Sequence, residues 1–270
     1  MGLAGSPSHF QMLIDKIMRG LQYEIILTYL DDLLIFSRDP QGMVQNLGQV
    51  FDRLRSANLK MHGAKCHFGV EKVHFLGHLF TSEGVSVNDD KIKIIRDYPV
   101  PRTPKQVRSF LGVANYYRRF VKDFSKISEP LRNLFRQDIP FVWSEKCQSA
   151  FDKLKTALTT APVLGLPDFQ LPFVLTTDAS TEGIGWILSN RHPDGSERVC
   201  LYGGRGLRMN EKRWTVSELE ALAPIEGIRN NHVYLAGKHF EVITDHRALI
   251  FLKTMKLPST ARLTRWSLFF

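Results

Sequence analysis

The pattern of apolar and polar positions predicts helices and short strands in the first part of the chain. Apolar residues recur at helical spacing after Ser6-Pro7 and again over residues 41–57, which predicts two amphipathic helices. Ser6 suits the helix cap and Pro7 the first helical position. Between these helices, the β-branched run Ile25–Phe36 predicts two short strands joined by a bend.

The rest of the chain alternates in the same way, and a mixed α/β (α+β) fold is expected. Strands are predicted at 65–68, 73–80, 173–177, 183–188 and 240–244, with a turn at Ser82-Glu83-Gly84. Residues 88–165 predict a helical module, with capping signals at Thr103-Pro104-Lys105-Gln106 and at Ser144. Another helix begins near Thr215. Prolines punctuate residues 161–172, which indicates a domain boundary there.

Two adjacent carboxylates, Asp31 and Asp32, interrupt the apolar run 25–36. One interpretation is structural, because aspartate suits the turn of a hairpin. The other is chemical, because paired carboxylates on a rigid hairpin are suited to holding divalent ions against nucleotide phosphates.

A second set of acids follows the predicted strands near the C-terminal end. Asp178 and Asp245 each follow an apolar strand directly, and Glu218 lies near the start of the helix between them. These three can converge on a patch that holds two Mg²⁺ ions about 4 Å apart. Each also has a structural interpretation: the aspartates can be turn residues, and Glu218 can close a capping box with Thr215. Glu220 is the rival acid on the same helix.

Charge points to a polyanionic partner. The 270 residues carry a net charge of +9, and residues 91–136 contain twelve Lys or Arg against three Asp or Glu. Arg118 and Arg119 stand among aromatic residues in Tyr116–Phe120, a composition typical of phosphate-gripping surfaces and also of an ordinary solvated basic face. No apolar run reaches the roughly 18 residues of a membrane span. Three widely spaced cysteines and the absence of a signal pattern favour an intracellular protein that is not secreted.

Short motifs then carry a resemblance to a known family. Gly5-Ser6-Pro7-x-x-Phe10-Gln11, Tyr29-Leu30-Asp31-Asp32, Lys65-Cys66-x-Phe68 and Phe75-Leu76-Gly77-His78 occur in this order. They are followed by Thr-Asp-Ala-Ser at 177–180, Glu-Leu-Glu-Ala-Leu at 218–222 and Thr-Asp-His at 244–246. The series resembles the Pol polyprotein of gypsy-type LTR retrotransposons.

The resemblance implies three parts and two activities. Residues 1–87 resemble a reverse transcriptase palm, 88–165 a helical thumb, and 166–270 a ribonuclease-H-like domain. The implied activities are RNA-directed DNA polymerisation and two-metal hydrolysis of RNA in RNA–DNA hybrids. The implied partners are a template–primer duplex, an RNA–DNA hybrid, dNTP and the rest of the polyprotein, in the cytoplasm or in virus-like particles.

The resemblance also implies roles for individual residues. The expected ligands of Mg²⁺, with Mn²⁺ as the alternative ion, are Asp31 and Asp32 in the polymerase, and Asp178, Glu218 and Asp245 in the nuclease. Glu218 is preferred to Glu220 because Glu-Leu-x-Ala-Leu matches the family pattern from that position. The expected nucleic-acid contacts are Tyr29, the primer-grip residues Phe75, Leu76, Gly77 and His78, and the thumb residues Arg118 and Arg119.

Three departures from the family lower the activity expected of this chain. It starts inside the palm, without the strand that carries the first polymerase aspartate, so primer extension is not expected. It stops before the fourth nuclease carboxylate, so at most weak hybrid cleavage at raised Mg²⁺ or Mn²⁺ is expected. Pro224 falls inside a predicted helix, at a cost of about 3 kcal/mol if the helix stays straight. The alternative is a partial gene model or a catalytically inactive nucleic-acid-binding remnant.

Overall fold

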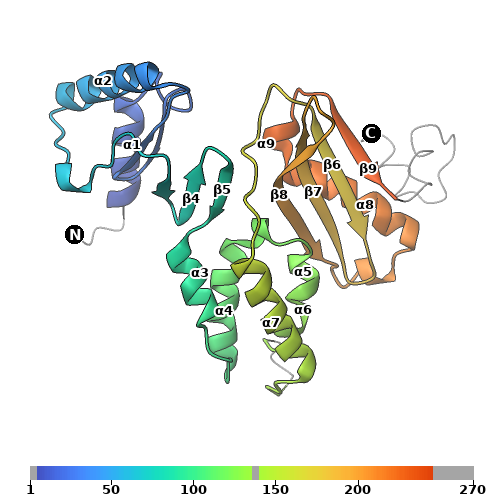
Figure 1. Ribbon diagram of the computed structural model, residues 1–270. Helices are drawn as coiled ribbons and strands as arrows, with labels where there is room; N and C mark the ends of the chain where they lie inside the picture. Colours follow the sequence, from blue (N-terminus) through green and yellow to red (C-terminus); the bar gives the residue numbers. More distant parts are fainter. Residues whose placement is uncertain (1–4, 136–139, 246–270) are drawn as a thin grey trace. The chain divides into compact units, whose positions relative to one another are not determined.

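The computed structural model describes residues 5–135 and 140–245 (Figure 1). Contacts divide the chain into two compact units, Met1–Leu76 and Gly77–Phe270, and each unit is described by itself. Both helices and strands are present in each unit, which confirms the mixed fold class. Within the described ranges, no helix has the length and apolar character needed to cross a membrane.

The first unit packs two helices on a short antiparallel hairpin. Its elements are α1 (Ser6–Ile17), β1 (Ile26–Tyr29), β2 (Asp32–Ile35), α2 (Pro40–Ser56), the 3-10 turn η1 (Gly63–Lys65) and β3 (Val73–Phe75). Tyr29 pairs with Asp32 across the hairpin. Ile14, Ile26 and Val50 are buried together and form the centre of the core.

Two local predictions in this unit are wrong. Ser6 is the first residue of α1 rather than its cap, since Gly5, which has no side chain to cap the helix, occupies the cap position. Residues 65–68 do not form a strand. Phe68 instead meets Phe51 of α2 edge-on, with ring centroids 6.1 Å apart. The apolar signal at that position therefore reports a helix contact, not a strand face.

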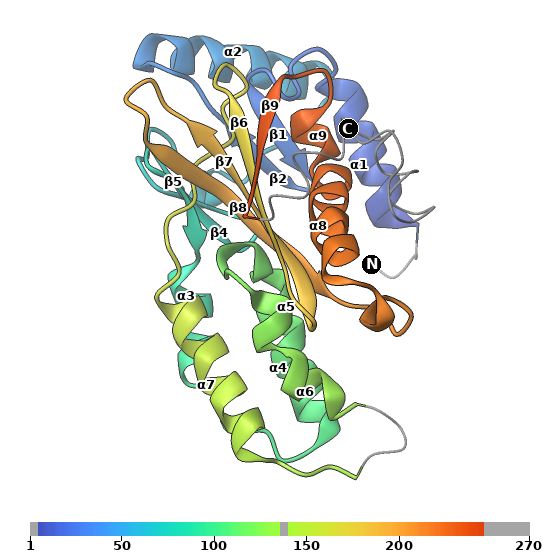
Figure 2. The same ribbon diagram turned by 90° about the vertical axis from the view of Figure 1, so that its right-hand side faces the viewer.

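The second unit contains a four-stranded sheet in the order β8-β7-β6-β9. Its strands are β6 (Phe173–Ala179), β7 (Gly183–Arg191), β8 (Glu197–Gly206) and β9 (Phe240–Thr244). The pairs β6–β7 and β7–β8 are antiparallel, while β6 and β9 run parallel. Helix α8 (Val216–Asn230) runs beside the sheet (Figure 2). It buries Leu222 and Ala223 against Leu175 and Trp186, and α9 (His232–Leu235) follows it.

A helical module completes the second unit. Its elements are the hairpin strands β4 (His78–Thr81) and β5 (Gly84–Val87), then α3 (Asp89–Arg96), α4 (Pro104–Tyr116), the 3-10 turn η2 (Arg118–Phe120), α5 (Phe124–Ile127), α6 (Glu129–Asn133) and α7 (Glu145–Thr159). The predicted caps Thr103 and Ser144 both accept backbone hydrogen bonds. Both η2 and α5 contact β8. Leu201 packs with the α8 core, whereas its neighbour Tyr202 packs with the cluster of Phe120, so the module and α8 cover opposite faces of the sheet.

Candidate functional site

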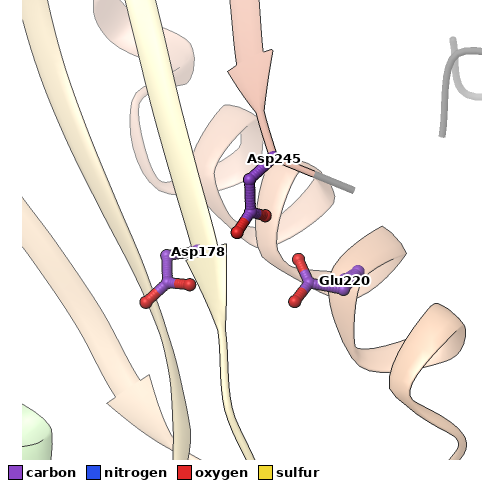
Figure 3. Close-up of side chains that lie close together, drawn as sticks. All are labelled: Asp178, Glu220 and Asp245. Atoms are coloured by element: carbon purple, nitrogen blue, oxygen red, sulfur yellow. The ribbon is translucent and has the colours of Figure 1, made fainter. Parts of the chain in front are cut away.

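Three carboxylates converge at one end of the sheet. Thr177 of β6 pairs with Thr244 of the parallel strand β9. The next residues, Asp178 and Asp245, therefore lie side by side at the same end of the sheet. Glu220 joins them from α8 (Figure 3). One oxygen of each carboxylate lies within 4.8 Å of the others. The predicted convergence of Asp178 and Asp245 with a helical glutamate is thus present.

The helical member of this group is Glu220 and not Glu218, which corrects the sequence-based choice. Glu218 is the third residue of α8, and its Oε2 accepts hydrogen bonds from the backbone N–H of Thr215 at 3.0 Å and from its hydroxyl at 3.2 Å. The Thr215 Oγ1 in turn accepts from the Glu218 N–H, which closes a capping box. Two residues along a helix are turned by about 200°, so Glu220 projects elsewhere. In the sequence, the Thr-x-x-Glu spacing of Thr215 and Glu218 already indicated that Glu218 serves as a helix-capping residue.

Burial and charge both act on Glu220. Its side chain is only 7% exposed, and within the described residues its Oε2 is buried without a hydrogen-bond partner. Burial, followed by the negative charges of Asp245 and Asp178, raises the pKa of Glu220 to about 7. A carboxyl group in this position favours its neutral form until a cation offsets the neighbouring charges. Asp178 and Asp245 are exposed, so the cluster opens to solvent on one side.

The paired aspartates of the first unit lie at an exposed turn. Asp31 and Asp32 follow Leu30, whose φ of +53° is in the left-handed region. The Leu30 N–H donates to Gln11 Oε1 at 2.6 Å, so α1 fixes the turn. From the sequence, Gln11 was recognised only as part of a motif, and its hydrogen bond to Leu30 was not predicted. Among the described residues, no third potential metal ligand lies close to Asp31 and Asp32. The group of three potential ligands found in the described part of the chain is the carboxylate cluster of the second unit.

Tyr29 lies at the end of β1, directly before this turn. Its side chain is 52% exposed, and a nucleic-acid contact there stays a prediction.

The segment Phe75–His78 forms a tight turn. Leu76 and Gly77 both have positive φ, at +49° and +73°. Tyr117 donates its hydroxyl to the Gly77 carbonyl at 2.8 Å, and the His78 ring lies 5.5 Å from the Tyr117 ring and 5.7 Å from that of Phe120. The helical module therefore fixes Gly77 and His78 within the second unit. Its role as a primer grip stays a prediction.

The two thumb arginines differ in environment. Arg118 is exposed, whereas Arg119 is partly buried and its Nε is inaccessible. Arg118 is thus better placed than Arg119 to meet a phosphate from solvent, although the predicted contacts of both remain untested.

A family model described as reverse transcriptase (RNA-dependent DNA polymerase) matches residues 1–80, and one described as an RNase H-like domain found in reverse transcriptase matches residues 143–242. Together they span more than half of the chain. It belongs to the family of retroelement reverse transcriptases with ribonuclease-H-like domains.

Curated relatives agree with this assignment. The chain is 37% identical over 264 residues to the retrovirus-related Pol polyprotein from transposon 412 of Drosophila melanogaster. It is 36% identical over 268 residues to that from transposon 297, and 32% identical over 271 residues to the transposon Tf2-3 polyprotein of Schizosaccharomyces pombe. These matches cover 98%, 98% and 99% of this chain. The chain spans 20–25% of the length of these three relatives.

Solved structures show the same fold. The foamy viral protease-reverse transcriptase dRH in complex with double-stranded DNA matches 98% of this chain and 47% of its own, with a TM-score of 0.85 at 22% identity. The foamy viral protease-reverse transcriptase in complex with an RNA/DNA hybrid matches 100% of this chain and 37% of its own, with a TM-score of 0.82 at 22% identity.

Proposed function

We propose that this retroelement segment serves RNA-directed DNA synthesis and hydrolyses the RNA strand of RNA–DNA hybrids, as part of a Pol polyprotein. The observation that supports the nuclease part is that Asp178, Glu220 and Asp245 converge at one end of the sheet. One of the similar solved structures is a complex with an RNA/DNA hybrid, which supports this class of substrate.

The carboxylate cluster fits a divalent cation. Its donors are oxygens, the ligand type that Mg²⁺ and Mn²⁺ prefer. The buried Glu220 Oε2 has no partner in the described part of the chain, and three acids crowd one point, so a cation would relieve both costs. Asp178, Glu220 and Asp245 would hold the metal, which when bound activates water and stabilises the leaving oxygen.

The polymerase part of the proposal concerns Asp31 and Asp32. Both carboxylates are exposed at a turn whose backbone is fixed by Gln11, so their oxygens are accessible and their position is defined. They would hold divalent ions that bind the phosphates of dNTP beside a template–primer duplex.

The nuclease proposal is tested by Mn²⁺ binding and by cleavage of an RNA–DNA hybrid with the 270-residue chain. Glu220→Gln should abolish both, because it removes a central ligand. Glu218→Gln is the matched control on the same helix and should retain both, at some loss of stability. Mn²⁺ binding that survives Glu220→Gln but not Glu218→Gln would overturn the site. Metal binding without cleavage by the parent would indicate an inactive remnant.

The polymerase ligands are tested separately in a chain carrying Asp178→Asn, which disables the nuclease cluster. Mn²⁺ binding in this background should be lost on adding Asp31→Asn with Asp32→Asn. Residual binding that ignores both substitutions would contradict the assignment.

A further inference from the structure

A lysine from outside the sheet reaches the carboxylate cluster. Lys126 belongs to α5, and its Nζ lies 3.9 Å from Asp178 Oδ2. Residues 81–142, which include α5, lie between the two family-model matches. Neither match therefore covers the element that brings this charge to the site.

Helix α5 is held against the sheet by a hydrogen bond, and the segment before it lies close to a glycine of β7. Ser125 donates its hydroxyl to the Gly204 carbonyl of β8 at 3.0 Å. A Cβ on Gly185 of β7 would lie 3.5 Å from Asp123 Oδ1. Gly185 pairs with Asp178 in the sheet, so the segment before α5 sits directly beside the cluster. The packing of α5 on the sheet thus determines the backbone position of Lys126.

Two cations and Asp178 line one small cavity. Arg118 and Lys126 line it together with Asp123 and Asp178, and its floor consists of Gly183, Gly185, Gly203 and Gly204 with their neighbours. The side chains of Val121, Phe124, Ile184 and Tyr202 line it as well. Arg118 and Lys126 thus place two positive charges close to the Asp178 carboxylate.

The contact between Lys126 and Asp178 contributes little to stability. The two side chains are 38% and 59% exposed, and ion pairs with such exposure are usually worth less than about 1 kcal/mol. Lys126 can consequently exchange Asp178 for another anion at small cost. An ammonium group on a flexible stem binds phosphate as a point charge.

We propose that Lys126 is a positioning residue that contacts a backbone phosphate of the nucleic-acid strand presented to Asp178, Glu220 and Asp245. This proposal rests on the nuclease function proposed above and names one contact that orients its substrate. Phosphate contacts of this kind fix the register of a strand without reading its sequence.

The test measures two affinities of the full chain, which should change in opposite directions in Lys126→Ala. Binding of an RNA–DNA hybrid in EDTA should weaken. The plot of log K against log salt should become less steep, with a slope smaller in magnitude by about 0.9. Binding of Mn²⁺ without nucleic acid should become about threefold tighter, because a nearby positive charge is removed. A residue with a merely structural role would weaken both.

Lys122→Ala is the matched control, because Lys122 is an exposed lysine of the same segment that does not line the cavity. It should leave Mn²⁺ affinity unchanged, and Lys126→Arg should restore hybrid binding. Hybrid affinity in Lys126→Ala equal to that of Lys122→Ala would overturn the proposal, as would a parent chain that does not bind the hybrid. Failure of the parent to bind Mn²⁺ would instead remove the proposed metal site, while the hybrid measurement in EDTA still decides the role of Lys126.

Discussion

Pro224 follows Glu220 by four residues in α8, so the Glu220 carbonyl receives no backbone hydrogen bond from that position. The helix nevertheless extends from Val216 to Asn230, and Pro224 is buried within it. The glutamate of the carboxylate cluster therefore stands where the hydrogen-bond ladder of its own helix is interrupted.

Replacing this proline should stabilise the second unit. Pro224→Val restores the backbone N–H at similar volume, and we expect the free energy of unfolding to rise by about 2 kcal/mol. Urea denaturation checks the change. Ile225→Val, one residue further, is the control and should lower the same quantity by about 1 kcal/mol, because it removes one buried methylene. An unchanged stability in Pro224→Val would mean that packing of the proline ring offsets the missing hydrogen bond.

Glu220 should make the stability of the metal-free chain depend on pH. Its pKa is raised from 4.5 to about 7, so the folded state holds a proton that the unfolded state releases. Stability should fall between about pH 4.5 and pH 7, by about 3 kcal/mol, and this contribution should then level off. Urea denaturation in EDTA across this range checks it.

The comparison for this pH effect is between Glu220→Gln and Glu83→Gln. Glu220→Gln should remove the decline, because the amide does not ionise. Glu83 is exposed in the turn between β4 and β5, and its replacement should preserve the decline. A decline of equal size in Glu220→Gln would assign the effect to another group.

Gln11 should control the turn that carries the paired aspartates. Gln11→Leu leaves the Leu30 N–H without its acceptor, at a cost of about 1–3 kcal/mol. The amide of Leu30 should then lose protection in hydrogen exchange. Met12→Ala, at an adjacent position that is 68% exposed, should leave that amide protected. Persistent protection in Gln11→Leu would show that the hairpin alone fixes the turn.

The two arginines of η2 should separate nucleic-acid binding from stability. Arg118→Ala should reduce the magnitude of the slope of log K against log salt for duplex binding by about 0.9. The free energy of unfolding should stay unchanged, because Arg118 is exposed. Arg119→Ala should lower the free energy of unfolding, because the partly buried Arg119 stem loses its packing. Salt titration of duplex binding and urea denaturation distinguish them. Equal effects of both substitutions on both quantities would contradict the assignment.

Local chemistry was predictable from the sequence where neighbouring residues decide it. Ser144 and Thr215 cap their helices as expected, and Asp178 and Asp245 end neighbouring strands. Lys126 was not predictable, since its distance from Asp178 depends on how α5 packs on β8. Glu220 was considered from the sequence but ranked below Glu218, because the family pattern was aligned from Glu218 although the capping spacing already gave that residue a structural role.

The parallel pairing of β6 and β9 makes the cluster sensitive to insertions in one place and indifferent in another. Asp178 and Asp245 meet because Thr177 is aligned with Thr244. One residue added within either strand would turn its aspartate toward the opposite face of the sheet. Residues added in the β7–β8 turn around Gly195 would leave that alignment intact. The acidic centre thus depends on the phase of two short strands and not on the length of chain that joins them.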